Sequence, residues 1–361
     1  MEKYRVGIVG ATGMVGQRFI SLLKDHPWFE VNCVAASARS AGKTYREAVG
    51  ERWAFAWEIP EKVAGMTVVD AADIDEVSKH VDFVFCAVDM KKDEIRALEE
   101  AYAKHEIPVV SNNSACRGIE DVPMVVPEIN ADHLAVIEAQ KKRLGTKNGF
   151  IAVKPNCSIQ SYVPALTPLL EFEPEKVSVC TYQAISGAGK TFETFPDILD
   201  NVIPYIGGED EKSESEPLKL WGHVEDGKIV NATLPVISAQ CLRVACSDGH
   251  MAAVSVSFKK KPTIEQIKER WANYETEAQR LELPSAPKPF LQYFEDPSRP
   301  QTRLDRDFQN GFGVSIGRLR EDKLFDYRFV CLSHNTVRGA AGGGILTAEL
   351  LCRKGYIPHR V

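Results

Sequence analysis

Long hydrophobic runs and long basic runs are both missing from this sequence of 361 residues. No apolar segment approaches the roughly 20 residues that a membrane-spanning helix requires. The formal net charge at pH 7 is −6, and no cluster of Lys and Arg offsets it locally. Nucleic acids and anionic membrane surfaces are therefore not favoured as partners. The N-terminus, 1–4, leads straight into a predicted strand, so no signal peptide is expected.

Regularly spaced cysteine pairs are also missing. The nine cysteines are an odd number and include no CxxC pair. This pattern fits neither a disulfide framework nor a zinc site, so no metal is expected, and it favours a reducing, cytoplasmic compartment. The remaining composition is ordinary for a globular protein, with 44% hydrophobic and 26% charged residues. The length suits two domains.

Strands and helices alternate over residues 1–150. The apolar patterns predict a charged amphipathic helix at 91–105 and strands at 5–9, 29–37, 81–88 and 107–112. Alternation of this kind is typical of an α/β domain, so we expect a Rossmann-like, doubly wound parallel sheet.

The pattern changes after residue 157. Strands are predicted at 176–185, 228–244, 250–260, 311–319 and 324–332, and helices at 190–202, 263–280 and 339–355. Long strands with few crossover helices predict an α+β second domain with a largely antiparallel sheet, one face of which is covered by helices. The acidic segment 204–218 is expected to be a surface loop or lid.

Three glycines, Gly10, Gly13 and Gly16, follow the first predicted strand and precede a helix. A loop of this kind lets the backbone approach a pyrophosphate, which then lies at the helix N-terminus. The spacing is GxxGxxG rather than the commoner GxGxxG, and a glycine-rich turn that binds nothing would look similar. The context favours a dinucleotide, with cofactor contacts expected from Gly10, Thr12, Gly13, Met14 and Val15.

The second predicted strand ends without the Asp or Glu that would bind the ribose 2′-hydroxyl of NAD. It is followed instead by Arg39, which Ser37, Ser40 and Lys43 flank. Positive charge and hydroxyl groups at this point suit a 2′-phosphate, so NADP is favoured over NAD. The alternative is an ordinary basic surface loop.

Cys157 lies where a strand-like run, 149–153, meets a helix-like segment. A thiol at such a junction faces the positive end of the helix dipole, which favours the reactive thiolate. The alternative is a packing residue, because most free cysteines are simply buried.

A cysteine nucleophile also needs a group that handles its proton. Among the eight histidines, His250 differs because it follows Gly249 and opens an apolar strand. Arg243 lies shortly upstream, and a strand–turn–strand between the two would aim both side chains at one cleft. Spacing alone does not establish this arrangement.

Together, the ordered motifs resemble the aspartate-semialdehyde dehydrogenases, in the branch found in archaea, fungi and some bacteria. The resemblance runs essentially end to end. The motifs that carry it are 10–16 (GATGMVG), 111–117 (SNNSACR), 155–158 (PNCS), 183–189 (QAISGAG), 216–219 (EPLK), 243–250 (RVACSDGH) and 335–341 (NTVRGAA). One departure is Ala245, where family members often have Pro.

The resemblance implies an NADPH-dependent reductive dephosphorylation of L-aspartyl 4-phosphate to L-aspartate 4-semialdehyde. This reaction belongs to the aspartate pathway to lysine, threonine, methionine and isoleucine. Cys157 would attack the acyl phosphate and hold a thioester, and His250 would take the thiol proton and act as acid and base. Asn156 would help to stabilise the oxyanion, and Gln183 would contact the substrate or the acyl-enzyme.

The resemblance also implies roles for the remaining polar residues. In the substrate site, Arg243 would bind the α-carboxylate, Glu216 the α-ammonium, and Arg117 and Lys219 the phosphate. The remaining cofactor contacts would come from Cys86, Ser186, Gly187, Gly189 and Asn335.

Two domains are expected. Residues 1–156 would bind NADP, completed by a C-terminal helix within 337–361, and residues 157–336 would form the catalytic and dimerisation domain. The resemblance implies a homodimer or homotetramer in which the sheets of the second domain pair across a two-fold axis.

Other functions remain open at this point. A CoA-thioester reductase of the malonyl-CoA type could use the same thiol, imidazole and NADPH. N-acetylglutamyl-phosphate reduction is a second alternative, and a non-catalytic NADP-binding protein is a third. A CoA substrate has no free α-ammonium for Glu216 to bind, which separates the first alternative from the favoured reaction.

Overall fold

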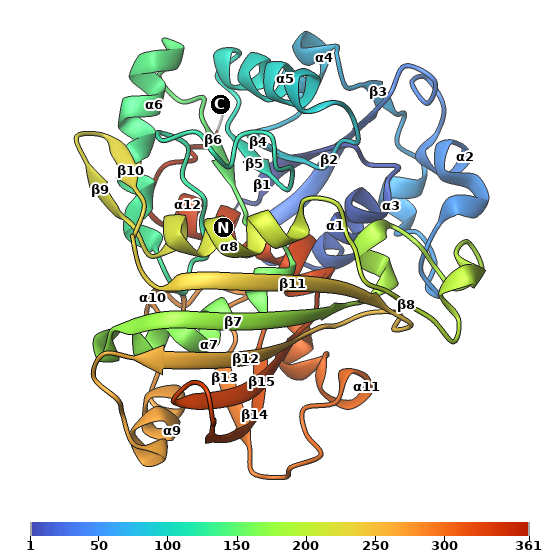
Figure 1. The fold of residues 1–361 in the computed structure, drawn as a ribbon. Coiled ribbons are helices and arrows are strands. Elements are labelled where there is room, and N and C mark those ends of the chain that lie inside the picture. The colour runs from blue at the N-terminus through green and yellow to red at the C-terminus, as the bar shows by residue number, and fades with distance from the viewer. Residues whose placement is uncertain (1, 360–361) are drawn as a thin grey trace.

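Two large sheets organise the computed structural model, which describes residues 2–359 (Figure 1). The first sheet has six strands in the order β3-β2-β1-β4-β5-β6, all parallel. The strands are β1 (Tyr4–Val9), β2 (Phe29–Ala36), β3 (Val69–Asp70), β4 (Phe83–Cys86), β5 (Val109–Ser111) and β6 (Ile151–Val153). The order reverses beside β1, so the predicted doubly wound sheet is confirmed.

Helices cover both faces of this parallel sheet. The helices are α1 (Met14–Leu23), α2 (Tyr45–Val49), α3 (Glu61–Ala64), α4 (Ile74–Ser78), α5 (Lys92–Lys104), α6 (Ile137–Leu144) and α12 (Gly342–Arg353). The four residues of β4 are all buried, as expected for a central strand with helices on each side. The last helix returns to the first sheet, where Leu346 packs in the same core as Phe19 and Phe85.

The second sheet has seven strands in the order β13-β14-β15-β12-β7-β11-β8. Its strands are β7 (Pro174–Gln183), β8 (Val202–Ile203), β11 (Val236–Val244), β12 (His250–Phe258), β13 (Leu291–Phe294), β14 (Val314–Glu321) and β15 (Tyr327–Ser333). The pairs β7–β11 and β13–β14 are parallel, and the other four are antiparallel. The prediction of a largely antiparallel sheet is therefore confirmed.

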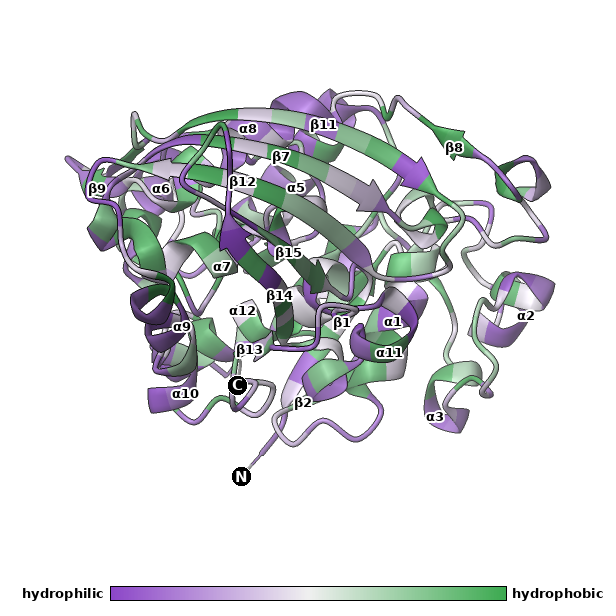
Figure 2. Cartoon of the chain, turned by 60° about the horizontal axis from the view of Figure 1, so that its bottom comes forward, coloured by the Kyte–Doolittle hydropathy of each residue, from purple (hydrophilic) through white to green (hydrophobic). Residues whose placement is uncertain are grey.

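The two faces of this second sheet differ. The helices of the domain are α7 (Val163–Leu166), α8 (Glu209–Leu220), α9 (Ile264–Ala272), α10 (Glu277–Arg280) and α11 (Thr302–Asp305). Along β12 every second residue, from His250 to Phe258, is buried. On the opposite face Tyr182 and Val236 stay exposed, and Figure 2 shows β11, β7 and β12 side by side across that face.

The segment 204–218 is not the predicted surface loop. Most of it forms α8, which packs against β11 and lies between the two sheets (Figure 1). Glu209, Ser213, Glu216 and Leu220 are buried on this helix. Their spacing of three and four residues places them on one helix face, and a polar face can be buried only where it is hydrogen-bonded.

Two further predictions about local structure are wrong. The segment 190–202 forms no α-helix: it contains a 3-10 turn at Pro196–Ile198 and the first residue of β8. The Thr191 and Thr194 hydroxyls bond local backbone groups before that proline. The predicted strand 228–244 is divided into β10 (Lys228–Val230), which pairs with β9 (His223–Glu225), and β11. Pro235 stands directly before β11 and has no N–H for a sheet ladder.

Within residues 2–359, no helix is long and apolar enough to cross a membrane. In the same part of the chain no three His, Cys, Asp or Glu side chains gather as a metal site would require. The nine cysteines are all free thiols.

Candidate active site

The candidate nucleophile, Cys157, lies just beyond the end of β6, and its side chain is only partly buried. The predicted helix does not follow it directly: a 3-10 turn of three residues, Ser158–Gln160, comes first, and α7 begins at Val163. The shift in the pKa of the thiol also runs against the expected thiolate. Burial raises the pKa of the Cys157 thiol, and the carboxylate of Glu209 raises it further. So short a turn supplies little dipole to oppose this desolvation.

The second sheet brings three predicted residues to one end of its buried face. Arg243 pairs with Gln183 across β11 and β7, and the β12 residue next to His250 pairs with the β7 residue next to Gln183. The Nε2 atom of His250 lies 3.5 Å from the Sγ of Cys157. The nucleophile and its proposed proton-handling partner therefore meet across the boundary between the two sheets.

The hydrogen bonds of His250 fix its protonation. Its Nδ1 accepts the backbone N–H of Ala184 at 3.0 Å, so the ring hydrogen lies on Nε2 and points toward the sulfur. Burial, followed by the charge of Arg243, lowers the pKa of His250 to about 3. In this geometry a neutral imidazole donates to the sulfur. For Nε2 to take the thiol proton, the ring hydrogen would first have to move to Nδ1, and Nδ1 would have to release the Ala184 amide.

Gly187 closes over the same point. A Cβ atom at this position would lie 3.0 Å from Nη1 of Arg243 and 3.0 Å from Nε2 of His250. Arg243 is 7% exposed, and its Nη1 donates to the Ala184 carbonyl at 2.7 Å. The missing side chain of Gly187 thus leaves space directly beside both functional groups.

Helix α8 supplies two buried carboxylates. Glu216 accepts from Nη1 of Arg117 at 2.9 Å and from the backbone N–H of Asn156 at 2.5 Å. Glu209 accepts from the Asn156 side-chain amide at 2.9 Å and from Gln183 at 3.2 Å. The residue that precedes the nucleophile is therefore held at its backbone by one carboxylate and at its side chain by the other.

These contacts change what Asn156 and Gln183 can do. The Oδ1 of Asn156 accepts from the N–H and the hydroxyl of Ser158, while its amide nitrogen donates to Glu209. Gln183 donates to Thr181 and Glu209. With these bonds formed, both side chains orient the nucleophile turn, and the two hydrogens of the Gln183 amide are both bonded.

Arg117 and Lys219 lie close to each other but differ in the groups that they contact. The Nζ of Lys219 donates to the backbone carbonyls of Arg117, Ile119 and Val122 at 2.7, 2.7 and 3.0 Å. An ammonium has three hydrogens, so these bonds use all of them. Glu216, three residues before Lys219 on the same helix, is bonded to Arg117.

A cavity of about 590 Å³ opens at the carboxyl edge of the parallel sheet. The predicted cofactor residues that line it are Gly10, Thr12, Gly13, Ser37, Arg39, Ser40 and Lys43. Arg52 also lines it and was missed, because it comes from a turn that the sequence does not connect with the glycine loop. The cavity lies beside β1, where the strand order reverses, which is the usual dinucleotide position in such sheets.

The glycine loop fits a pyrophosphate by its shape. Gly10 has φ of +90°, and a Cβ there would lie 2.3 Å from the Ala87 carbonyl oxygen. A Cβ at Gly16 would meet the Gly10 carbonyl at 2.3 Å, whereas one at Gly13 would approach nothing closer than 3.6 Å. Gly10 and Gly16 therefore permit the tight turn, and Gly13 keeps the mouth of the loop open.

The remaining cofactor predictions fall at different places. Met14 and Ser186 line a smaller cavity of about 220 Å³ between the two sheets. Asn335 donates to the Ser186 hydroxyl and accepts from the Gly249 amide, so it ties the turn before His250 to the 186 loop. Cys86 is 1% exposed, beneath the wall of the larger cavity. Val15 and Gly189 line neither cavity.

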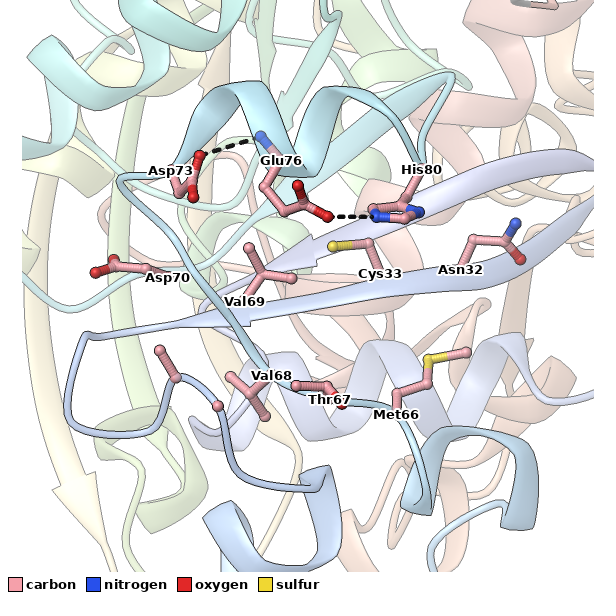
Figure 3. Close-up of a pocket in the computed structure, with 12 residues that line it drawn as sticks. Asn32, Cys33, Met66, Thr67, Val68, Val69, Asp70, Asp73, Glu76 and His80 are labelled. Carbon is pink, nitrogen blue, oxygen red and sulfur yellow. Dashed lines mark hydrogen bonds and ion pairs between the residues drawn. The ribbon is translucent and has the colours of Figure 1, made fainter.

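A further cavity of about 530 Å³ lies at the β3 edge of the parallel sheet (Figure 3). Asp70, Asp73 and Glu76 line it, and Figure 3 shows Glu76 bonded to His80 at 3.0 Å. None of the predicted catalytic residues borders this space. Its carboxylates would repel the phosphates of a dinucleotide, so the cavity at the glycine loop is the better cofactor site.

Sequence reasoning missed two charged groups near the nucleophile. Lys154 is 3% exposed, and Glu209 is 8% exposed. Glu209 could have been found from the sequence, because Glu209, Ser213 and Glu216 have the spacing of one helix face, although the segment was predicted to be a loop. Lys154 gave no signal, because a lysine three residues before a cysteine is normally exposed to solvent.

Two family models match the chain. Residues 5–137 match "Semialdehyde dehydrogenase, NAD binding domain", and residues 166–338 match "Semialdehyde dehydrogenase, dimerisation domain". Cys157 lies in the segment between the two matched regions.

Curated relatives are similar over almost the whole chain. An aspartate-semialdehyde dehydrogenase of Aspergillus fumigatus is 44% identical, with 98% of this chain and 99% of the relative covered. One from Archaeoglobus fulgidus is 43% identical, with 98% and 100% covered. The crystal structure of the Candida albicans enzyme with NADP is 40% identical, with a TM-score of 0.89 and 99% and 100% covered. The chain belongs to the aspartate-semialdehyde dehydrogenase family.

Proposed function

We propose that this member of the aspartate-semialdehyde dehydrogenase family reduces L-aspartyl 4-phosphate to L-aspartate 4-semialdehyde, with NADPH, through a thioester on Cys157. The observation that carries this proposal is the Sγ–Nε2 distance of 3.5 Å between Cys157 and His250, in a protein whose cavity at the glycine loop fits a dinucleotide. A nucleophile, a proton donor and a cofactor site are the parts that the reaction requires.

The first step forms a bond between the Cys157 sulfur and the acyl carbon, while the carbon–oxygen bond to phosphate breaks and phosphate leaves with that electron pair. When bound, NADPH supplies the hydride that reduces the thioester. The thiol proton leaves with the phosphate, and the Nε2–H of His250 donates to the sulfur during attack and then to the oxyanion of the thiohemiacetal on that sulfur. Collapse of this adduct releases the aldehyde and a thiolate, which takes up a proton to restore the thiol.

The polar groups around Cys157 suit the rest of this substrate. The planar guanidinium of Arg243 matches the α-carboxylate. Glu216 and Glu209 are the carboxylates available for an α-ammonium, and Arg117 is a cation for the phosphate. A substrate that lacks the α-ammonium would offer these carboxylates no cation to bind.

NADP is the cofactor of this proposal. The Candida albicans structure was solved with NADP, and Arg39, Ser40 and Lys43 line the glycine-loop cavity here. Arg52 adds a third cation to that wall. Positive charge without a carboxylate at the end of β2 suits a ribose 2′-phosphate.

The proposal extends to organisation and context. The open face of the second sheet, with Tyr182 and Val236 exposed, is the surface that would pair across a two-fold axis in a dimer or tetramer. Residues 1–156 with 337–361 would form the NADP domain, and 157–336 the catalytic and dimerisation domain. The product aldehyde would feed the synthesis of lysine, threonine, methionine and isoleucine in the cytoplasm.

The direct test is the reverse reaction. Purified protein is given L-aspartate 4-semialdehyde, NADP and inorganic phosphate, and NADPH formation is followed by absorbance. Turnover should require phosphate and should exceed reduction of malonyl-CoA or N-acetylglutamyl phosphate by NADPH. Faster turnover of either alternative substrate would overturn the choice of substrate.

A further inference from the structure

The turn that follows β15 packs directly on the nucleophile. Residues Val337–Ala341 form a single π-helical turn, in which the Gly339 N–H donates to the His334 carbonyl at 3.0 Å. We call this segment the π-turn. A Cβ atom at Gly339 would lie 2.8 Å from the Cβ of Cys157 and 3.2 Å from its Cα. The backbone of the π-turn therefore forms one side of the space that holds the nucleophile, and π-turns are frequent at functional sites.

Arg338, the residue before Gly339, fixes the π-turn to Glu128. Its Nη1 and Nη2 donate to Oε1 and Oε2 of Glu128 at 2.8 and 3.0 Å. Nη1 also donates to the Phe312 carbonyl at 2.9 Å, and the guanidinium lies 4.4 Å from the centroid of the Phe290 ring. Arg338 is 2% exposed and Glu128 is 3% exposed. A bidentate pair of this kind fixes direction as well as distance.

Glu128 is in turn tied to the strand that leads to the nucleophile. It lies in a segment that runs beside β6, where the Val125 N–H donates to the Val153 carbonyl at 2.8 Å and the Val153 N–H donates to the Pro123 carbonyl at 2.9 Å. Cys157 comes shortly after Val153 in the chain. The Glu128–Arg338 pair therefore joins the strand that leads to Cys157 to the turn that packs against Cys157.

Stability alone does not account for this pair. Burying two charges costs free energy that their attraction offsets only when the geometry is good, and apolar side chains of similar volume are often equally stable. The Nε of Arg338 is buried and has no hydrogen-bond partner among residues 2–359, which adds to that cost. Neither side chain lines the cofactor cavity or the smaller cavity beside Ser186. What the pair supplies, and an apolar pair would not, is a fixed direction for the π-turn.

We propose that the Glu128–Arg338 pair positions the nucleophile: it holds Gly339 against Cys157 and so keeps the sulfur 3.5 Å from Nε2 of His250. This inference rests on the proposed function and adds to it two positioning residues that act through Gly339. No bond to either side chain forms or breaks in the reaction. Their effect is nevertheless large, because a misplacement of about 1 Å at a reacting atom can lower a rate by about 10²-fold.

The first experiment separates position from stability in the oxidation of aspartate semialdehyde. Arg338→Lys and Glu128→Gln each break the bidentate pair, and Glu128→Leu combined with Arg338→Met replaces it with apolar side chains. The single variants should lower the melting temperature and should lower kcat about 10- to 100-fold, while the KM values for the aldehyde, phosphate and NADP change less than about threefold. In the double variant the melting temperature should recover, because no buried charge is left unpaired, whereas kcat should stay low.

Arg5→Lys is the matched control, because Arg5 and Asp82 form an arginine–carboxylate pair near the start of β1, at the edge of the parallel sheet opposite the glycine loop. It should keep kcat within about twofold of the unmodified enzyme. Alkylation of Cys157 by iodoacetamide gives a second readout. Its rate should rise at least about threefold in the three pair variants, because a displaced π-turn uncovers the thiol, and should not change in Arg5→Lys.

The second experiment acts on the contact itself. Gly339→Ala places a methyl group against Cys157 while the ion pair stays intact, and it should lower kcat about 10- to 100-fold. Combined with Arg338→Lys, it should lower kcat little further than either change alone, because both act through the same contact. Gly65→Ala is the control and should leave kcat unchanged, since a Cβ atom at Gly65 would approach nothing within 4 Å.

Any of three outcomes would overturn the positioning role. They are an unchanged kcat in folded Arg338→Lys and Glu128→Gln, a double variant in which kcat recovers together with the melting temperature, and a Gly339→Ala effect that multiplies with that of Arg338→Lys. If the single variants do not fold, the double variant decides. An unmodified enzyme inactive on aspartate semialdehyde would instead refute the proposed function, and the alkylation rates would still test the positioning role.

Discussion

The cofactor cavity and the catalytic pocket are built in opposite ways. The cavity takes nearly half of its lining residues from two short segments, 10–13 and 37–43, and the Arg39 and Lys43 side chains are exposed. The pocket joins side chains far apart in sequence, such as Cys157 and His250, and His250 is 0% exposed. Exposed groups act nearly independently, whereas buried charges change one another's protonation.

This comparison predicts that removing a reacting group from the pocket has a much larger consequence than removing a cofactor contact from the cavity. The largest is expected for Cys157→Ala, which removes the group that holds the acyl chain. Turnover should fall by about 10⁴-fold or more, measured as phosphate-dependent NADPH formation. Mass spectrometry after acyl phosphate addition should show no acyl-enzyme.

Cys116→Ala is the matched control, since Cys116 is buried at 0% exposure in a motif close to Arg117. It should keep turnover within severalfold of the unmodified enzyme. Normal turnover by Cys157→Ala would end the thioester mechanism.

The next largest effect is expected at His250. His250→Ala should lower kcat by about 10²–10⁴-fold, because the donor to the sulfur and to the oxyanion is lost. His250→Gln should retain more activity than His250→Ala, because its amide can still donate toward the sulfur.

The pH profile of kcat for the unmodified enzyme tests whether His250 acts as a neutral donor. With a pKa of about 3, His250 stays neutral as pH falls from 8 to 5, so kcat should show no inflection from this residue near pH 6.5. A kcat inflection there that disappears in His250→Gln would mean that the imidazole titrates normally and accepts the thiol proton.

A moderate effect is expected in the cofactor cavity. Arg39→Ala should raise the KM for NADP about tenfold and leave the KM for NAD within about twofold, because only NADP carries the 2′-phosphate. Initial rates with both cofactors measure this. The exposed Lys24, on the far end of α1, offers a control as Lys24→Ala, which should change neither constant. If Arg39→Ala changed the KM for NADP and the KM for NAD equally, Arg39 would not bind the 2′-phosphate.

The smallest change is expected from Glu209→Gln, in the pocket itself. Glu209 is the strongest of the charges that raise the pKa of Cys157, so its neutralisation should shift the pH profile of iodoacetamide alkylation to lower pH, by roughly one unit or less. The rate at pH 7 should rise accordingly.

Glu211→Gln is the matched control for this measurement, because Glu211 lies on the exposed side of the same helix. It should leave the alkylation profile unchanged. A Glu209→Gln profile that stays in place, or moves to higher pH, would contradict the charge coupling between α8 and the nucleophile.

The sequence predicted features that depend on neighbouring residues. The glycine spacing, the strand alternation and the Arg39 loop indicated the parallel sheet and its cavity. The motifs also singled out Cys157, His250, Arg243 and Gly187, which the fold brings together. Predictions failed where burial reversed a local signal: 204–218 reads as a polar loop, yet its Glu209 and Glu216 become buried ligands of Asn156.

By itself the sequence determined the two kinds of sheet and the residue types of the reaction, because hydrophobic period and turn chemistry are local. Only the tertiary structure decided how those residues are charged and paired. Cys157 lies beside buried Lys154 and Glu209, Nδ1 of His250 is occupied by the Ala184 amide, and Lys219 is taken by backbone carbonyls. Protonation depends on which distant groups exclude water and share hydrogen bonds, and chain order does not contain that information.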